Sequence, residues 1–229
     1  EKTWFKTKQF LKPCFQRKEY FCSFNKKKGN DKVFLLGHSV MASIQEEMKE
    51  NLTLRDLNFI PMTVAAGKNL KNYEKRRDKI LESENSTIIF HALYNEDKKE
   101  LSILIKKINF FLKNNYKIIL LYPLPKFKEN ISEILAKQII SKKLSYKKNY
   151  LNISYTDYIN KTEPIFTKLD KLKHENLYKM HPHKIFCNSI VKNKCIAHNN
   201  KETFFIDGQH LSKKGSILIN MDLMKIIDK

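Results

Sequence analysis

The chain has 229 residues, which is enough for one large domain or two small ones. It contains no run of 18 or more uncharged apolar residues, so no transmembrane helix is predicted, and its first residues lack the apolar core of a secretory signal. Because the sequence begins at Glu1 rather than at a methionine, we expect a piece of a longer protein, with any membrane or targeting segment upstream.

The formal net charge of +20 has two interpretations. One is a polyanionic partner, either nucleic acid or an acidic polysaccharide. The other is the codon usage of an AT-rich genome, because almost all of the 44 basic residues are lysine and Asn and Ile are abundant. Nucleic-acid readers depend on arginine, and no zinc finger, aromatic RNA-binding signature or clear helix-turn-helix is present. We therefore expect no nucleic-acid partner, and keep a basic DNA-binding domain as the rival hypothesis.

Four cysteines form two local pairs, Cys14 with Cys22 and Cys187 with Cys195. Disulfides between near neighbours would place the domain in an oxidising compartment, such as a periplasm or the cell exterior. A zinc site is the alternative, but cysteine pairs that bind zinc usually lie two to four residues apart. The spacing favours the two disulfides.

Short apolar runs alternate with stretches of helical spacing along most of the chain. In chain order the predicted elements are a strand at 33–36, a helix at 43–51, a strand within 56–67 that ends near Gly67, a helix within 69–84, a strand at 87–92, a helix within 96–115, a strand at 117–122, a helix at 131–144, a weaker strand at 151–159 and a final helix at 215–228. Strands of four to six residues between longer helices predict a parallel sheet with helices on both faces.

Ligand sites in such folds lie at the carboxyl ends of the strands. Residues 37–39, 67, 93–96 and 123–125 fall at those ends. Among them, Ser39 is either a nucleophile or only the cap of the next helix, since serine is a common residue where a helix begins.

Asp207 and His210 are three residues apart just before the last helix. On a tight turn or a helix start such side chains share a face, so Asp207 could accept the Nδ1 proton of His210. The Nε2 atom of His210 would then be free to take a proton from a serine hydroxyl, as in a Ser-His-Asp triad. The alternative is a helix cap beside a surface histidine.

The two motifs at opposite ends of the chain resemble the SGNH hydrolase family, also called GDSL-like. The first family block, Gly-Asp-Ser, corresponds to residues 37–39, and the last, Asp-x-x-His, to Asp207 and His210. The resemblance implies a three-layer α/β/α, flavodoxin-like fold with a central parallel sheet. It also implies that Ser39, His210 and Asp207 are catalytic.

The two middle blocks of the family match more weakly. Gly67 is the candidate for the glycine whose backbone N–H helps to bind the oxyanion, and Asn95 is the candidate side-chain donor. With the Ser39 N–H these residues would form the oxyanion hole. Two departures stand out: His38 replaces the Asp of the first block, and Glu96 replaces the Asp of the third, which also lacks its glycine. We expect His38, as a neutral side chain, to reduce activity without abolishing it.

Residues 187–216, which contain the second cysteine pair and the run HLSKKG, are most similar to SGNH domains fused to acyltransferase-family-three membrane proteins. The Cys14–Cys22 segment fits the same group. This resemblance implies a basic N-terminal extension (residues 1–30, with a Cys14–Cys22 hairpin) and an SGNH-like domain (residues 31–229).

The resemblance also implies an enzyme that transfers an acyl group, acetyl above all, to a sugar hydroxyl of a surface polysaccharide. A membrane acyltransferase domain of the same polypeptide would deliver the acyl donor, and the lysine surplus would suit an anionic glycan acceptor. The domain would be periplasmic or otherwise extracytoplasmic, tethered to the inner membrane by the missing N-terminal region. No metal or organic cofactor is expected. The alternatives are a carbohydrate esterase or deacetylase of the same fold, and a catalytically impaired relative that binds glycans.

Several other residues have less specific interpretations. His181 and His183 could mark a metal site, but we expect a solvated loop. His91 is expected in or beside a strand near the site, where it only packs. Tyr94 is a candidate for stacking on a sugar ring, with ordinary packing as the alternative.

Overall fold

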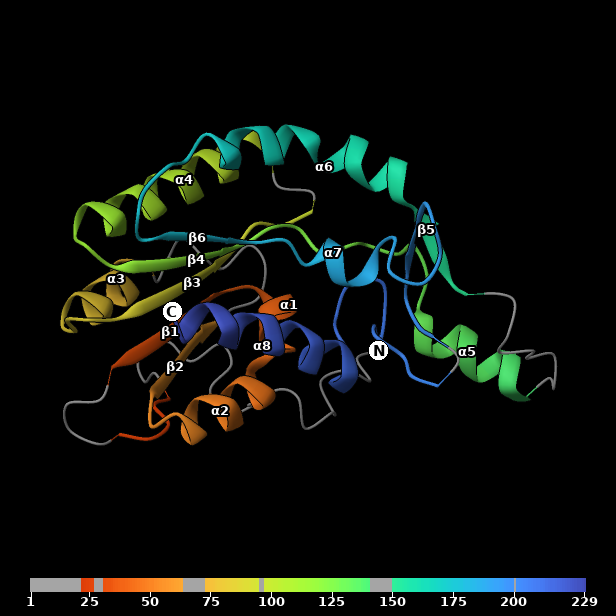
Figure 1. Cartoon of the computed structure of the whole chain (residues 1–229), viewed down its shortest axis with the longest axis horizontal. Coiled ribbons are helices and arrows are strands. Elements are labelled where there is room, and N and C mark those ends of the chain that lie inside the picture. The colour runs from red at the N-terminus through yellow and green to blue at the C-terminus, as the bar shows by residue number, and fades with distance from the viewer. Residues whose placement is uncertain (1–21, 27–30, 64–72, 95–96, 141–149, 200) are drawn as a thin grey trace.

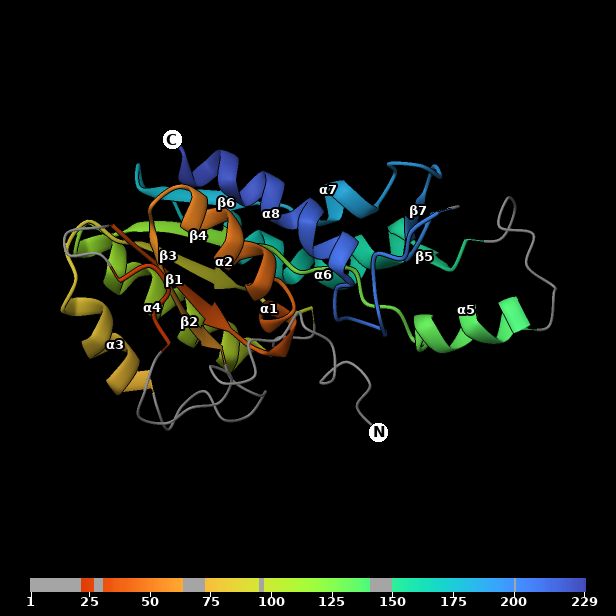
Figure 2. The ribbon, with the colours of Figure 1, turned by 90° about the horizontal axis from the view of Figure 1, so that it is seen from below.

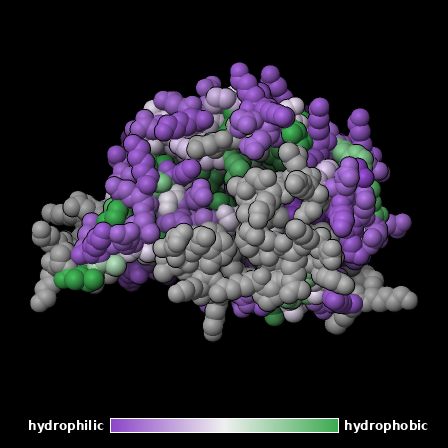
Figure 3. All heavy atoms as spheres, turned by 180° about the vertical axis from the view of Figure 1, so that it is seen from behind, coloured by the Kyte–Doolittle hydropathy of each residue, from purple (hydrophilic) through white to green (hydrophobic). Residues whose placement is uncertain are grey.

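The computed structural model describes residues 22–26, 31–63, 73–94, 97–140, 150–199 and 201–229. A central sheet lies between two layers of helices (Figure 1). None of the helices in these ranges is long and apolar enough to cross a membrane. In the view of Figure 3, hydrophilic side chains cover most of the described surface, and hydrophobic atoms lie on the floor of a recess.

All neighbouring strands of the central sheet are parallel. In spatial order they are β2 (Asn58–Thr63), β1 (Lys32–Gly37), β3 (Thr87–His91), β4 (Lys117–Leu121) and β6 (Leu177–Met180). This is the flavodoxin-like order, in which the chain reverses its direction of winding between β1 and β3. The predicted fold class is confirmed, and the reversal occurs beside the end of β1, where Ser39 follows.

The helices are interleaved with the strands along the chain. They are α1 (Ser39–Ala42), α2 (Gln45–Leu54), α3 (Tyr73–Leu81), α4 (Lys98–Lys113), α5 (Ile131–Ile140), α6 (Tyr155–Asp170), α7 (His183–Phe186) and α8 (Lys213–Ile227). Figure 2 shows α2 and α8 side by side in front of the strands, and their side chains share one core.

Two cores lie on opposite faces of the sheet because successive strand side chains point to opposite sides. In β1, Val33 and Leu35 pack with α1, α2 and α8, whereas Phe34 and Leu36 pack with α3, α4 and α6. Strands buried on both faces have continuous apolar sequences. For this reason the sequence locates β1, β3 and β4 correctly.

The predicted strand at residues 151–159 is wrong. Only β5 (Asn152–Ser154) is extended, and it pairs antiparallel with β7 (Lys194–Ile196), outside the central sheet. Ser154 ends the strand, because its hydroxyl accepts a hydrogen bond from the Asp157 N–H at 3.2 Å and caps α6. The fifth parallel strand is β6, which the sequence analysis missed.

Most of residues 1–30, the predicted N-terminal extension, lie outside the described residues, so this division of the chain stays a prediction. Within residues 22–26, Phe24 exchanges two backbone hydrogen bonds of 3.0 Å with Phe59 of β2. This part of the extension therefore contacts the sheet edge. Cys14 lies outside the described residues, so its pairing with Cys22 stays a prediction.

Candidate active site

Ser39 lies at the carboxyl end of β1, as the first residue of α1. The turn before it is tight, since a Cβ atom on Gly37 would lie 2.6 Å from Cγ of Met41. The cap position belongs to His38, whose side chain makes no capping hydrogen bond. The Ser39 hydroxyl instead lies 2.9 Å from Nε2 of His210. The interpretation of Ser39 as a mere helix cap is therefore not supported.

His210 lies on a turn that Asp207 organises. One oxygen of Asp207, Oδ1, accepts hydrogen bonds of 2.8 Å from the backbone N–H groups of Gln209 and His210. The other oxygen, Oδ2, is 2.7 Å from Nδ1 of the His210 ring. Helix α8 starts only at Lys213, after its cap Ser212, so the Asp-x-x-His motif precedes the helix, as its spacing predicts.

These contacts fix the proton arrangement of the histidine. With Nδ1 donating to the Asp207 carboxylate, Nε2 of the neutral ring is left as the acceptor for the Ser39 hydroxyl. Burial alone would raise the pKa of Asp207, but the hydrogen bonds and charge of His210, with two backbone N–H groups, outweigh it and hold that pKa below its ordinary value. The aspartate is therefore ionised at neutral pH and can stabilise a protonated His210.

Buried contacts between the two ends of the chain bring Ser39 to His210. The Ser43 hydroxyl donates to the Val40 carbonyl at 2.6 Å and accepts from the Leu211 N–H at 3.3 Å. Deeper in the same interface, the Asn220 amide of α8 donates to the Ile44 carbonyl at 3.2 Å. The sequence analysis missed Ser43 and Asn220, because a buried polar side chain gives no local signal of its distant partner.

The comparisons with known proteins decide the family. A family model described as the SGNH domain fused to AT3 domains matches residues 8–225. The chain belongs to this SGNH family. A search of curated protein sequences finds no match.

A solved structure has the same fold as this SGNH domain. It is the periplasmic domain of a lipopolysaccharide acetyltransferase from Salmonella ser. Paratyphi A. The TM-score is 0.64 at 15% sequence identity, and the match covers 89% of this chain and 85% of the other. At this identity the likeness establishes the fold of this chain and not its activity.

Two of the expected oxyanion-hole residues of the SGNH domain, Gly67 and Asn95, lie outside the described residues. Their roles stay predictions. Ser39, the third, occupies the first position of α1, where backbone N–H groups have no partner within the helix.

His38 replaces the family aspartate beside the nucleophile. Burial, and after it the nearby charges of Lys107 and Arg76, lowers the pKa of His38. The side chain is therefore neutral at neutral pH, as we expected. The positive charges of Lys107 and Arg76 thus act on a position where the first family block has an aspartate.

His91 is the last residue of β3, close to Gly37, as the sequence analysis placed it. It is buried, and neither ring nitrogen has a hydrogen-bond partner among the described residues. Burial, with a smaller effect of His38, lowers its pKa to about 3. His91 therefore packs beside the turn that carries Ser39, as a neutral ring.

The prediction of a solvated loop at His181 and His183 is wrong. His183 begins α7, is only 5% exposed and packs against Tyr158 and Phe166, with ring centroids 5.5 Å away in both cases. His181 lies 4.1 Å from the ring of Tyr122, measured between centroids. Within the described ranges, no group of three or more His, Cys, Asp or Glu side chains could hold a metal ion.

The predicted bond between Cys187 and Cys195 is confirmed as a disulfide. It joins the end of α7 to β7, and both cysteines are buried. The bond closes the loop that precedes the Asp207 turn. It therefore braces the segment that carries the last family block.

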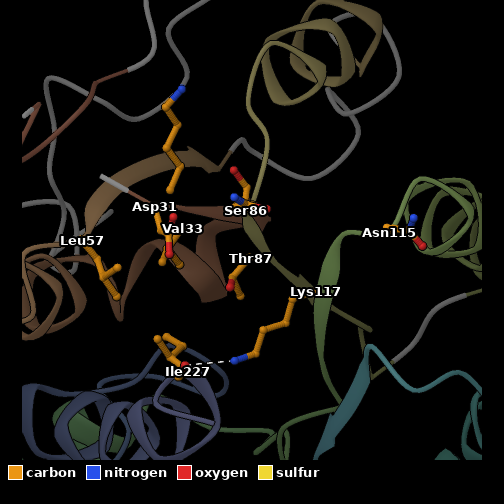
Figure 4. A pocket seen from close by; sticks show the side chains of 10 residues that line it. Asp31, Val33, Leu57, Ser86, Thr87, Asn115, Lys117 and Ile227 are labelled. Atoms are coloured by element: carbon orange, nitrogen blue, oxygen red, sulfur yellow. Dashed lines mark hydrogen bonds between the residues drawn. The ribbon is translucent and has the colours of Figure 1, made fainter. Parts of the chain in front are cut away.

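A pocket of about 300 Å³ lies at the opposite edge of the sheet from Ser39 (Figure 4). Val33, Thr87 and Lys117 line it at the amino ends of their strands. The Lys117 ammonium donates to the Ile227 carbonyl at 2.9 Å, which ties the sheet to the end of α8. This pocket is remote from the Ser39–His210 pair, and its lysine has a structural partner.

Proposed function

We propose that this SGNH domain transfers an acyl group, acetyl in the first instance, to a sugar hydroxyl of a surface polysaccharide. Ser39 is the nucleophile, His210 the general base and acid, and Asp207 the residue that orients and stabilises His210. The observation that carries the proposal is the unbroken series of hydrogen bonds from Ser39 through His210 to Asp207.

In the first step the Ser39 oxygen attacks the carbonyl carbon of the acyl donor, and its proton passes to Nε2 of His210. The tetrahedral intermediate collapses when the leaving group takes that proton, which leaves an acyl-serine. In the second step a sugar hydroxyl gives its proton to His210 and attacks the acyl-serine. The ester forms on the sugar, and Ser39 regains its proton.

The negative oxygen of both intermediates needs hydrogen-bond donors. The Ser39 N–H, at the start of α1, is the donor that lies within the described residues. Gly67 and Asn95 are proposed as the other two, from the family pattern alone. Removing one such donor typically slows an enzyme about 10²–10³-fold.

The family description supports the proposed partner and location. Its members are SGNH domains fused to AT3 domains. We propose that a membrane acyltransferase domain of the same polypeptide supplies the acyl donor. We also propose that the SGNH domain is extracytoplasmic and is tethered to the inner membrane by a region N-terminal to it. The disulfide between Cys187 and Cys195 supports an oxidising compartment.

One observation favours a second function within the same fold. His38 stands where the family has an aspartate, which would suit an impaired relative that binds glycans without acylating them. Against this, the hydrogen bonds among Ser39, His210 and Asp207 are all in place. With water as the acceptor the same residues would act as an esterase.

Labelling with a fluorophosphonate probe, followed by peptide mapping, tests the nucleophile. We expect one adduct on Ser39, loss of labelling in His210→Ala and a decrease of about 10²–10⁴-fold in Asp207→Asn. Ser102→Ala and His174→Ala, at exposed positions, are the matched controls. A folded protein without an adduct on Ser39 would favour the glycan-binding relative.

Product analysis then separates transfer from hydrolysis. The acyl-serine formed from a small acetyl ester is challenged with oligosaccharides in water, and the acetate is counted as free acid or as sugar ester. A sugar ester supports the transferase. Free acetate alone, across neutral and acidic sugars, would support the esterase.

A further inference from the structure

A groove of about 380 Å³ borders the Asp207 turn. We call it the Tyr94 groove; its lining includes Tyr94, Tyr158, Lys126, Lys128, Lys161 and Asp157. These residues come from the segments that follow β3 and β4 and from the first turns of α6. Because β3 and β4 are parallel, their carboxyl ends lie on the same edge of the sheet as Ser39.

The groove is joined directly to the turn that carries His210. Phe127, between the two groove lysines, donates its backbone N–H to the Gly208 carbonyl at 2.7 Å. Its ring packs against Phe205, with centroids 4.9 Å apart. A Cβ atom on Gly208 would collide with the Phe127 carbonyl, so the two backbones approach as closely as only glycine permits. The backbone of Lys126 and Lys128 is therefore fixed beside Asp207.

The charge of the groove is positive. Lys126, Lys128 and Lys161 are exposed, and within the described part of the chain none of them forms an ion pair. Among the described residues, Asp157 is the single acid that lines the groove, and it lies in the first turn of α6, where a helix favours negative charge. Three lysines are thus available to an anion from outside.

The groove also contains an aromatic surface. The Tyr94 and Tyr158 rings are stacked, with centroids 5.9 Å apart. Tyr158 is fully buried and fixed, since its hydroxyl donates to the Pro123 carbonyl at 2.6 Å, whereas Tyr94 remains partly exposed. A partly exposed ring on a rigid support presents a flat apolar face, and sugar rings pack on such faces.

We infer that the Tyr94 groove binds an anionic saccharide, whose carboxylate or phosphate contacts the three lysines while a sugar ring packs on Tyr94. The saccharide is the acyl acceptor, so this inference rests on the proposed function and names the substrate class of the same site. Phe127 would link the bound sugar to the turn that carries His210, because its backbone contacts Gly208.

Binding of defined sugars to the 229-residue chain tests the inference. The probes are trigalacturonate, which carries carboxylates, glucose 1-phosphate, which carries a phosphate, and neutral maltotriose. We expect one of the two anions to bind at least tenfold more tightly than maltotriose at 50 mM salt, and to weaken at 300 mM salt because the contacts are exposed. The anion that binds identifies the acidic group.

Matched charge variants locate the binding. Replacing Lys126, Lys128 and Lys161 together by Gln should weaken the anion about tenfold, which is about 1.4 kcal/mol and within the range of three exposed ion pairs. The control replaces three other exposed lysines by Gln, namely Lys168, Lys171 and Lys173. It removes the same charge outside the groove and should change affinity less than twofold.

Three results would overturn the inference. The first is that neither anion binds better than maltotriose. The second is that the two triple variants weaken binding equally, which would assign the effect to net charge. The third is that the groove variant loses binding to phosphatidylglycerol vesicles while it keeps its affinity for the sugars, which would make the patch a membrane contact. Labelling of Ser39 without anion binding refutes this inference alone. Anion binding in the groove without labelling refutes the proposed catalysis and with it the acceptor role of the sugar, but leaves the groove as a site for anionic saccharides.

Discussion

Replacing His91 by leucine should make the stability of the domain less sensitive to acid. His91 is buried beside the turn that carries Ser39, and its pKa is lowered to about 3 by burial and, to a smaller extent, by His38. In the unfolded chain it should titrate near 6.5. A lowered pKa means that His91 contributes stability above pH 6.5, and that this contribution is lost progressively as the pH falls toward 3.

The size of the effect follows from the same two values. At pH 5, which lies about 1.5 pH units below the ordinary pKa, His91 is protonated in the unfolded chain and neutral in the folded chain. At about 1.4 kcal/mol per unit, the free energy of unfolding should be lower at pH 5 than at pH 8 by about 2 kcal/mol from His91 alone. Burial also lowers the pKa of His183, to about 4, and that of His181. The decrease in the wild type should therefore exceed this amount.

Urea unfolding followed by circular dichroism at pH 8, 6.5 and 5 measures the effect. The decrease from pH 8 to pH 5 should be about 2 kcal/mol smaller in His91→Leu than in the wild type. Leucine has a similar size and removes two ring nitrogens without partners among the described residues, so stability at pH 8 should not fall greatly. His174→Gln, at an exposed position, is the control. Equal pH dependence in His91→Leu and the wild type would refute the assignment of a buried, neutral His91.

Two further predictions concern the nucleophile turn and the disulfide. His38→Asp restores the aspartate of the first family block near the positive charges of Arg76 and Lys107. The added attraction should raise the rate of Ser39 labelling about tenfold, or about 1.4 kcal/mol; slower labelling in a folded variant would contradict this. Replacing Cys187 and Cys195 together by alanine opens a short loop and should lower the free energy of urea unfolding by about 2–3 kcal/mol. An unchanged midpoint and slope would show that the bond does not stabilise the segment before Asp207.

The strands that could be predicted from the sequence are those whose side chains are buried on both faces of the sheet. The strands β1, β3 and β4 are buried on both faces, and their apolar runs are unmistakable. The edge strand β6 was missed because Tyr178 and Lys179 are only partly buried, which breaks the apolar run. At residues 151–159 the β-branched and aromatic residues suggested a strand, but the Ser154 cap starts a helix there.

The two contacts of the candidate active site differed in how far the sequence could predict them. The contact between Asp207 and His210 is local, so a spacing of three residues was enough to predict it. The contact between Ser39 and His210 joins residues 171 positions apart, and it depends on the docking of α8 against α1 and α2. Only the family resemblance pointed to that contact before the structure placed it.

The Tyr94 groove lay beyond prediction for a different reason. Tyr94 was a candidate for sugar stacking, but Lys126, Lys128 and Lys161 could not be told from the many other basic residues of the chain. Their significance depends on the fold, which brings the segments after β3 and β4 and the start of α6 to one place. Lysine side chains can form a specific binding site only where the fold brings several of them together.

The Ser39–His210 contact and the exposed groove place different demands on the chain. Proton transfer between Ser39 and His210 needs a geometry held to about 0.5 Å. His210 is buried, at 4% exposure, and its hydrogen bond to Asp207 fixes the orientation of its ring. Lysine side chains in the groove are long and exposed, so they can follow an acidic sugar but cannot fix its position. In the proposed complex that position would depend instead on the contact between the Phe127 and Gly208 backbones. Under this proposal, the lysines could change with the acceptor while the backbone contact with the His210 turn is kept.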